Sequence, residues 1–127
     1  MPSRGDHDVF VDSAGRGWIA YTVIEGGLPV DIAIEPLNPA LTSGAGAAVR
    51  LGLGVVEAPS LFEREGRFYL AYSDPACPYC PGTGTGIAVA SGPMGPGTTA
   101  PTMSAKSCDG QPSEGTRLRL ADETSWL

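Results

Sequence analysis

The chain has 127 residues, which is enough for one domain with a hydrophobic core. Its formal net charge of -6 argues against a nucleic-acid partner, because nucleic-acid binding needs a basic surface. No apolar run approaches the roughly 20 residues of a membrane span, so no membrane segment is expected. The first residues lack the apolar stretch of a signal peptide.

The composition favours an all-β fold. The chain contains 18 Gly and 12 Pro, yet 42% of its residues are hydrophobic, which argues against disorder. No stretch shows the apolar spacing of an amphipathic helix over three turns. Short strands joined by Gly- and Pro-containing turns are therefore expected, with almost no helix.

The first half of the chain predicts a series of short strands. Apolar and aromatic residues alternate with polar ones in segments bounded by glycines and prolines. The expected strands are 9–11, 18–23, 30–35 and 47–51.

The segment 55–74 predicts a β-hairpin with an acidic residue at its entrance. Glu65-Gly66 is the turn signal between two apolar, aromatic-rich runs. Pro59 cannot donate a ladder hydrogen bond, so it belongs at the start or the edge of a strand. Glu57, two residues earlier, is therefore expected at the mouth of a strand, where a rigid sheet presents side chains to a ligand.

The pattern of the first half recurs in the second half. Trp18 and its strand align with Tyr69, and Ile32 aligns with Ile87, a spacing of roughly 50 residues that is typical of a propeller blade with four strands. The alternative is that any two hairpins with aromatic strands and Gly turns look alike.

The repeat predicts β-propeller blades of four antiparallel strands. The first blade is expected at 6–52, the second at 55–108 and the start of a third at 116–127. A propeller closes with about four to eight blades, so this set is an incomplete propeller. We expect either a piece of a larger protein or a chain that self-associates to cover its open blade edges.

Three motifs in register resemble glycoside hydrolase family 43, which has a five-bladed β-propeller. The first is Asp6-His7-Asp8-Val9-Phe10-Val11-Asp12, followed by Gly15 and an aromatic-rich strand. The second is Glu57-Ala58-Pro59 with its hairpin, and the third is the strand from Ile87 that ends in a Ser-Gly-Pro turn. The resemblance covers nearly the whole chain.

The resemblance implies roles for individual carboxylates. Glu57 would be the general acid, and Asp6 would adjust its pKa and orient it, with Asp8 as the alternative for that role. The general base of the family is an Asp on a preceding blade, and this chain has no equivalent. The isolated chain is therefore expected to be inactive.

The resemblance also implies a substrate class and a location. The expected reaction is inverting hydrolysis of arabinose, xylose or galactose linkages in plant-type polysaccharides or oligosaccharides, by an extracellular or periplasmic (secreted) protein. No cofactor is expected, although a structural calcium ion is compatible with the complete family fold. The competing hypothesis is a non-catalytic carbohydrate-binding or structural propeller unit.

Each candidate residue also has an ordinary structural interpretation. Without the resemblance, Glu57 is expected to be a solvated acid at the start of a strand, and Asp6 and Asp8 are expected to cap turns. His7 lies in a polar run and is expected on the surface. The strand aromatics are expected in the core, although they are able to stack on sugar rings. These aromatics are Trp18, Tyr21, Tyr69 and Tyr72.

The three cysteines are Cys77, Cys80 and Cys108. Because their number is odd, at least one of them has no disulfide partner within the chain. Cys77-Pro78-Tyr79-Cys80 matches a redox motif, but the following segment 81–86 cannot begin the helix that such chemistry needs. The spacing is also not that of a zinc finger, with or without His7. A disulfide from Cys108 to Cys77 or Cys80 is the simpler expectation, and a small thiol or metal protein is a third hypothesis.

Overall fold

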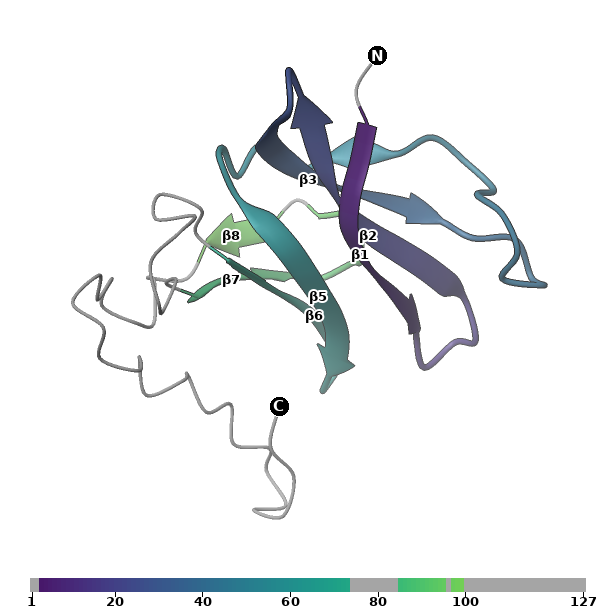
Figure 1. Ribbon diagram of the computed structural model, residues 1–127. Helices are drawn as coiled ribbons and strands as arrows, with labels where there is room; N and C mark the ends of the chain where they lie inside the picture. The colour runs from purple at the N-terminus through teal and green to yellow at the C-terminus, as the bar shows by residue number, and fades with distance from the viewer. Residues whose placement is uncertain (1–2, 74–84, 96, 100–127) are drawn as a thin grey trace.

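The computed structural model of the protein describes residues 3–73, 85–95 and 97–99 (Figure 1). These residues form two four-stranded antiparallel sheets in the orders β1-β2-β3-β4 and β5-β6-β7-β8. Consecutive strands are neighbours in each sheet, as in a propeller blade. The described residues form no helix, so none of them provides a membrane-spanning helix. The all-β, two-blade prediction is confirmed.

The strands are β1 (Ser3–Val11), β2 (Gly17–Glu25), β3 (Leu28–Pro36), β4 (Val49–Arg50), β5 (Glu57–Arg64), β6 (Arg67–Ser73), β7 (Thr85–Ala90) and β8 (Gly97–Thr99). β1 begins six residues before the predicted strand because its polar first half pairs with β2 through Arg4 and Ser3. β8 was not predicted, since a three-residue Gly-Thr-Thr segment carries no hydrophobic pattern. The proposed third blade start at 116–127 lies outside the described residues.

Two of the hairpins have tight turns with left-handed residues. Gly26 and Gly27 join β2 to β3 with φ angles of 60° and 82°, and Glu65 and Gly66 join β5 to β6 with φ angles of 51° and 72°. Positive φ at both central residues is the signature of a type I′ turn, whose twist matches that of the flanking strands. The predicted turn at Glu65-Gly66 is confirmed.

The turn between β1 and β2 is organised by one buried carboxylate. Oδ1 of Asp12 accepts hydrogen bonds from the backbone N–H of Ala14 and of Arg16, both at 2.9 Å. Oδ2 accepts from Arg16 Nε at 2.9 Å and from Trp18 Nε1 at 3.0 Å. Burial by itself raises the pKa of Asp12, but these hydrogen bonds and the Arg16 charge outweigh burial, so the pKa lies below its ordinary value of 3.8.

The hydrophobic core lies between the two sheets. Trp18 and Ala20 of β2 and Ile32 and Ile34 of β3 alternate along their strands, so they project from one face of the first sheet. This face packs on the second sheet, where Leu61 is among the buried residues. As predicted, Trp18 and Tyr21 are buried, and each is only 7% exposed. Tyr69 and Tyr72, also expected in the core, are only partly buried.

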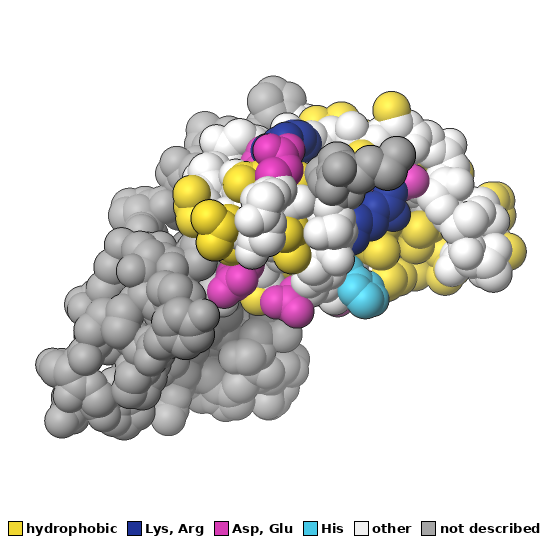
Figure 2. Space-filling model, turned by 45° about the horizontal axis from the view of Figure 1, so that its top comes forward, with side chains coloured by type: hydrophobic (Ala, Val, Ile, Leu, Met, Phe, Trp, Pro, Cys, Tyr) yellow, Lys and Arg dark blue, Asp and Glu magenta, His cyan; other side chains and the backbone are white. Residues whose placement is uncertain are grey.

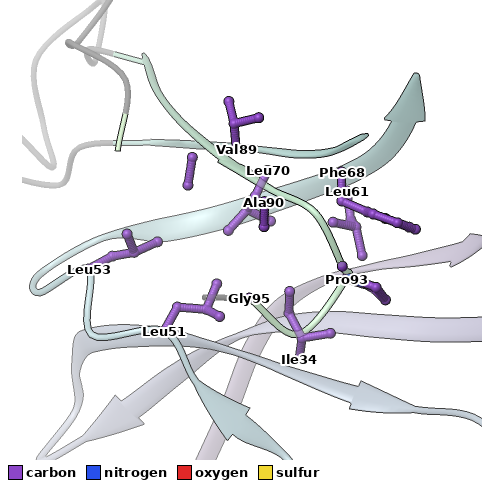
Figure 3. A pocket seen from close by; sticks show the side chains of 12 residues that line it. Ile34, Leu51, Leu53, Leu61, Phe68, Leu70, Val89, Ala90, Pro93 and Gly95 are labelled. Atoms are coloured by element: carbon purple, nitrogen blue, oxygen red, sulfur yellow. The ribbon is translucent and has the colours of Figure 1, made fainter. Parts of the chain in front are cut away.

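A small apolar cavity remains in this core, with a volume of about 50 Å³ (Figure 3). It is bounded by Ile34 of the first sheet, by Leu61 of the second, and by Leu51 and Leu53 of the segment that joins them. Because its walls carry only apolar side chains and glycine, this pocket offers no polar group that would orient a sugar.

A second buried carboxylate, Asp31 on β3, anchors the segment that joins the sheets. Its Oδ2 accepts from the backbone N–H of Gly52 at 2.9 Å, and its Oδ1 accepts from Leu53 N–H at 3.0 Å. Arg50 contacts Asp31 and also forms an ion pair with Glu25 at 2.7 Å. These contacts fix where the chain enters β5.

Candidate active site

The first strands of the two sheets, β1 and β5, lie side by side and run in the same direction (Figure 1). Asp8 of β1 joins them, because its Oδ2 accepts a hydrogen bond from Leu61 N–H at 2.9 Å and from Ser60 Oγ at 3.3 Å. A backbone donor of β5 that faces β1 is thereby satisfied by a side chain of the neighbouring sheet. Asp8 therefore links the two blades through these hydrogen bonds.

A second contact between the blades lies at the far end of the same strands. Glu63 of β5 accepts from the backbone N–H of Ser13 at 2.7 Å and from its hydroxyl at 2.8 Å. Ser13 belongs to the turn that follows β1, so this contact docks the β1–β2 turn on the second sheet. Together, Asp8 and Glu63 set the position of β5 relative to β1.

Glu57 is the first residue of β5 and is half-buried. The pairing of β5 with β6 is interrupted between Glu57 and Ser60, so a bulge follows Glu57 directly. Ala58 in this bulge has a φ of 51°, a left-handed conformation that is strained for a residue with a Cβ. The position of Glu57 at a strand mouth, and of Pro59 on an edge strand, agrees with the sequence-based expectation.

Asp6 lies in an irregularity of β1, where the pairing with β2 shifts between Arg4 and His7. Its side chain is exposed. Asp6 precedes Asp8 by two residues, and Asp8 is the residue that contacts β5, so Asp6 lies at the end of β1 that adjoins the start of β5. Within the described part of the chain, neither Asp6 nor Glu57 has a side-chain hydrogen bond.

The cation nearest to Asp6 in the sequence is engaged elsewhere. Arg4 forms an ion pair with Glu35 at 3.0 Å, and its guanidinium lies 4.5 Å from the centre of the Tyr21 ring. His7 is exposed, as predicted, and Figure 2 shows the histidine on the surface beside basic and hydrophobic side chains. No hydrogen bond or ion pair joins Arg4 to Glu57, since Arg4 is paired with Glu35.

No group of three or more His, Cys, Asp or Glu side chains is arranged as a metal site within the residues that the structure describes. Cys77, Cys80 and Cys108, the three disulfide candidates, lie outside those residues. Asp6 and Glu57 thus lie on the first strands of adjacent sheets, and these strands contact each other. A half-buried carboxyl with a second carboxylate on the adjoining strand suits acid catalysis.

The sequence analysis did not single out Thr22, although the structure places its side chain next to the Glu57 bulge. Its hydroxyl accepts a hydrogen bond from the backbone N–H of Ala58 at 3.1 Å. A threonine in an apolar strand carries no signal that distinguishes it from an ordinary strand residue, because threonine is common in strands.

No family model and no curated protein matches the sequence. Solved structures do match. A thermostable family-43 glycoside hydrolase is 24% identical over 78% of this chain and 37% of that chain, with a TM-score of 0.67. An endo-1,4-beta-xylanase from Bacteroides thetaiotaomicron is 25% identical over 80% of this chain and 38% of its own, also with a TM-score of 0.67.

A family 43 arabinoxylan arabinofuranohydrolase from Bacillus subtilis is 25% identical, with a TM-score of 0.60. The match covers 74% of this chain and 22% of that enzyme. The chain thus spans less than two-fifths of the length of these three structures. By its fold, the chain corresponds to about two blades of the family 43 propeller, so the chain itself is an incomplete propeller.

Proposed function

We propose that this chain is part of a glycoside hydrolase of the family 43 type, with Glu57 as the general acid and Asp6 as the carboxylate that adjusts its pKa. The observation that carries the proposal is the placement of these two residues at irregularities of the first strands of adjacent sheets, which contact each other. Three similar structures are named as a glycoside hydrolase, a xylanase and an arabinofuranohydrolase.

Inverting hydrolysis needs a second carboxylate that acts as general base. The acid and the base lie roughly 6.5–9.5 Å apart, on opposite sides of the sugar, so that a water molecule fits between them. Asp6 is not assigned this role, because in the family that the chain resembles the base is an Asp on a preceding blade. The base would therefore come from a further blade. The substrates would be arabinose, xylose or galactose linkages.

The competing proposal is a non-catalytic carbohydrate-binding or structural unit. It requires neither a base nor a proton from Glu57. The two proposals differ in one measurable property, since only the catalytic one makes bond cleavage depend on the proton of Glu57.

The test supplies the missing nucleophile from solution. The chain is incubated with phenyl arabinofuranoside, xyloside and galactoside, whose leaving group is poor, with and without sodium azide. Azide replaces the base-activated water and attacks the anomeric carbon, the glycosidic bond breaks, and phenol leaves with the proton that Glu57 donates. We expect no turnover in water, and azide-dependent formation of a glycosyl azide of inverted configuration.

The matched control compares two glutamates. Glu57→Gln removes the proton donor and should abolish azide-dependent cleavage of glycosides with poor leaving groups. Glu65→Gln changes an exposed turn residue and should leave it intact. Sugar binding without azide-dependent cleavage would overturn the catalytic proposal in favour of the binding unit. Turnover in water that Glu57→Gln abolishes would show that a base is present after all.

A further inference from the structure

Thr22 lies at the one position of β2 that faces irregular segments of both β1 and β5. It is only 1% exposed. Its neighbours in β2, Tyr21 and Val23, are paired with His7 and Arg4 of β1. Thr22 is therefore the single β2 residue opposite two residues of β1, Gly5 and Asp6, which is the arrangement of a β-bulge.

The β1 bulge packs directly on the Thr22 side chain. A Cβ added to Gly5 would lie 3.2 Å from Thr22 Cβ and 2.9 Å from Ile24 Cδ1, which is closer than side chains normally approach. The backbone that carries Asp6 therefore rests against Thr22, and only glycine fits at position 5 without displacement.

The β5 bulge is held by the same side chain. Oγ1 of Thr22 accepts the hydrogen bond from Ala58 N–H at 3.1 Å. Ala58 directly follows Glu57 and has a φ of 51°, a conformation that persists only where surrounding contacts impose it. The neighbouring Pro59 has no N–H, so the Ala58 amide is the backbone donor of this bulge that reaches the first sheet.

We infer that Thr22 is a positioning residue that aligns the two candidate carboxylates, by supporting the Asp6 bulge with its body and the Glu57 bulge with its hydroxyl. One side chain thereby fixes the position of β1 at Asp6 and the position of β5 at Glu57. Bulges next to active sites commonly set the direction of a side chain. One residue that contacts both bulges would keep the two side chains at a constant separation. This inference rests on the proposed function of Glu57 and Asp6.

The first measurement needs no substitution. In amide hydrogen exchange followed by NMR, the Ala58 amide should be protected to a degree comparable with that of the Leu61 amide, which Asp8 holds. An Ala58 amide that exchanges at the rate of an unprotected amide would overturn the inference.

The second measurement compares two substitutions of Thr22. Thr22→Val keeps the shape and removes the hydroxyl, so exchange of the Ala58 amide should accelerate about tenfold relative to Leu61, as for loss of one hydrogen bond. The NMR chemical shift of the Glu57 side-chain carboxyl carbon should change as well, because only the hydroxyl that holds the Glu57 bulge is lost. Thr22→Ser keeps the hydroxyl and should restore both properties.

Ser13→Ala is the matched control, because it removes a contact between the blades at the opposite end of β5. It should change neither the Ala58 exchange rate nor the chemical shift of the Glu57 carboxyl carbon. Equal effects of Thr22→Val, Thr22→Ser and Ser13→Ala would show general loosening of the sheets and would overturn the inference. These readouts do not depend on turnover, so a failed azide assay leaves them interpretable and challenges only the proposed function.

Discussion

Ala58, next to Glu57, has a positive φ angle that is unfavourable for a residue with a Cβ. Non-glycine residues in the left-handed region are uncommon, and the three described here are Leu41, Ala58 and Glu65. Glu65 has an ordinary reason, since a type I′ turn needs positive φ. Ala58 lies inside a strand, so its conformation serves the bulge after Glu57 and is maintained by the Thr22 hydrogen bond.

We predict that Ala58→Gly stabilises the protein. An L-residue costs about 1–2 kcal/mol in the left-handed region, and glycine gives back about 0.5–1 kcal/mol through its larger unfolded-state entropy. The net gain in the free energy of unfolding should be about 0.5–1 kcal/mol, measured by urea denaturation. Ala14→Gly, in a turn where φ is not positive, is the control and should destabilise by about 0.4–1 kcal/mol. A loss of stability in Ala58→Gly would contradict the strain argument.

Asp12 makes the stability of the protein depend on pH. Its pKa in the folded state is lowered from 3.8, mainly through hydrogen bonds from Trp18 and Arg16 that overcome burial. The stabilisation is thus present above 3.8 and is lost as the pH falls through the lower folded-state pKa, because the unfolded chain binds the proton first.

The predicted outcome is a decline of unfolding free energy below pH 3.8 that is shallower in Asp12→Asn, measured by urea denaturation across pH. The variant should also be less stable at neutral pH, since its amide has one acceptor oxygen for four donors. Identical slopes in the two proteins would contradict the role given to Asp12.

At the scale of elements, the contact between β1 and β5 shows that Asp6 and Asp8, which the sequence left as alternatives, have different roles. Asp8 satisfies the buried Leu61 amide, whereas Asp6 has no hydrogen-bond partner within the described residues. This division favours Asp6 for the site and Asp8 for the docking of one sheet on the other.

We predict that Asp8→Ala lowers the free energy of unfolding by about 1–3 kcal/mol, the cost of leaving a buried amide without an acceptor. Asp6→Ala should change it by no more than about 0.5 kcal/mol, as is usual for an exposed residue. Asp8→Asn retains an acceptor oxygen and should recover most of the loss. Equal destabilisation by Asp6→Ala and Asp8→Ala in thermal or urea unfolding would remove this distinction.

At the scale of the whole molecule, the outer face of the first sheet is apolar and only partly covered. Val9 and Val11 of β1 are 51% and 47% exposed, and Val9 pairs with Ile19, which lies on the face turned away from the second sheet. In the repeat, Ile19 corresponds to Leu70, and Leu70 lies on the face of the second sheet that packs on the first sheet. The outer face of the first sheet is thus equivalent to a face that packs on another blade.

We propose that a second copy of the chain covers this face, so that the mass in solution exceeds the monomer mass of 13.0 kDa in light scattering. The double variant Val9→Lys, Val11→Lys should reduce the measured mass to that of the monomer, because it places charges on the buried face. Val55→Lys, at a valine that is 61% exposed elsewhere, should not. A monomeric starting protein would refute self-association.

The sequence by itself determined the strand pattern, the hairpin turn at Glu65-Gly66, the two-blade repeat and the position of Glu57 at a strand start. These follow from local rules, namely alternation of apolar residues, glycine in tight turns and the missing donor of proline. The sequence left the choice between Asp6 and Asp8 open, because two acids in one strand look alike until a partner is known.

Only the tertiary structure decided what joins the blades. The hydrogen bonds from Ala58 to Thr22, from Leu61 to Asp8 and from Ser13 to Glu63 connect residues that lie 36 to 53 positions apart. No local pattern encodes such pairs, since each depends on how one sheet packs on the other. For the same reason Thr22 escaped notice, because its importance lies in the two bulges that it contacts and not in its own strand.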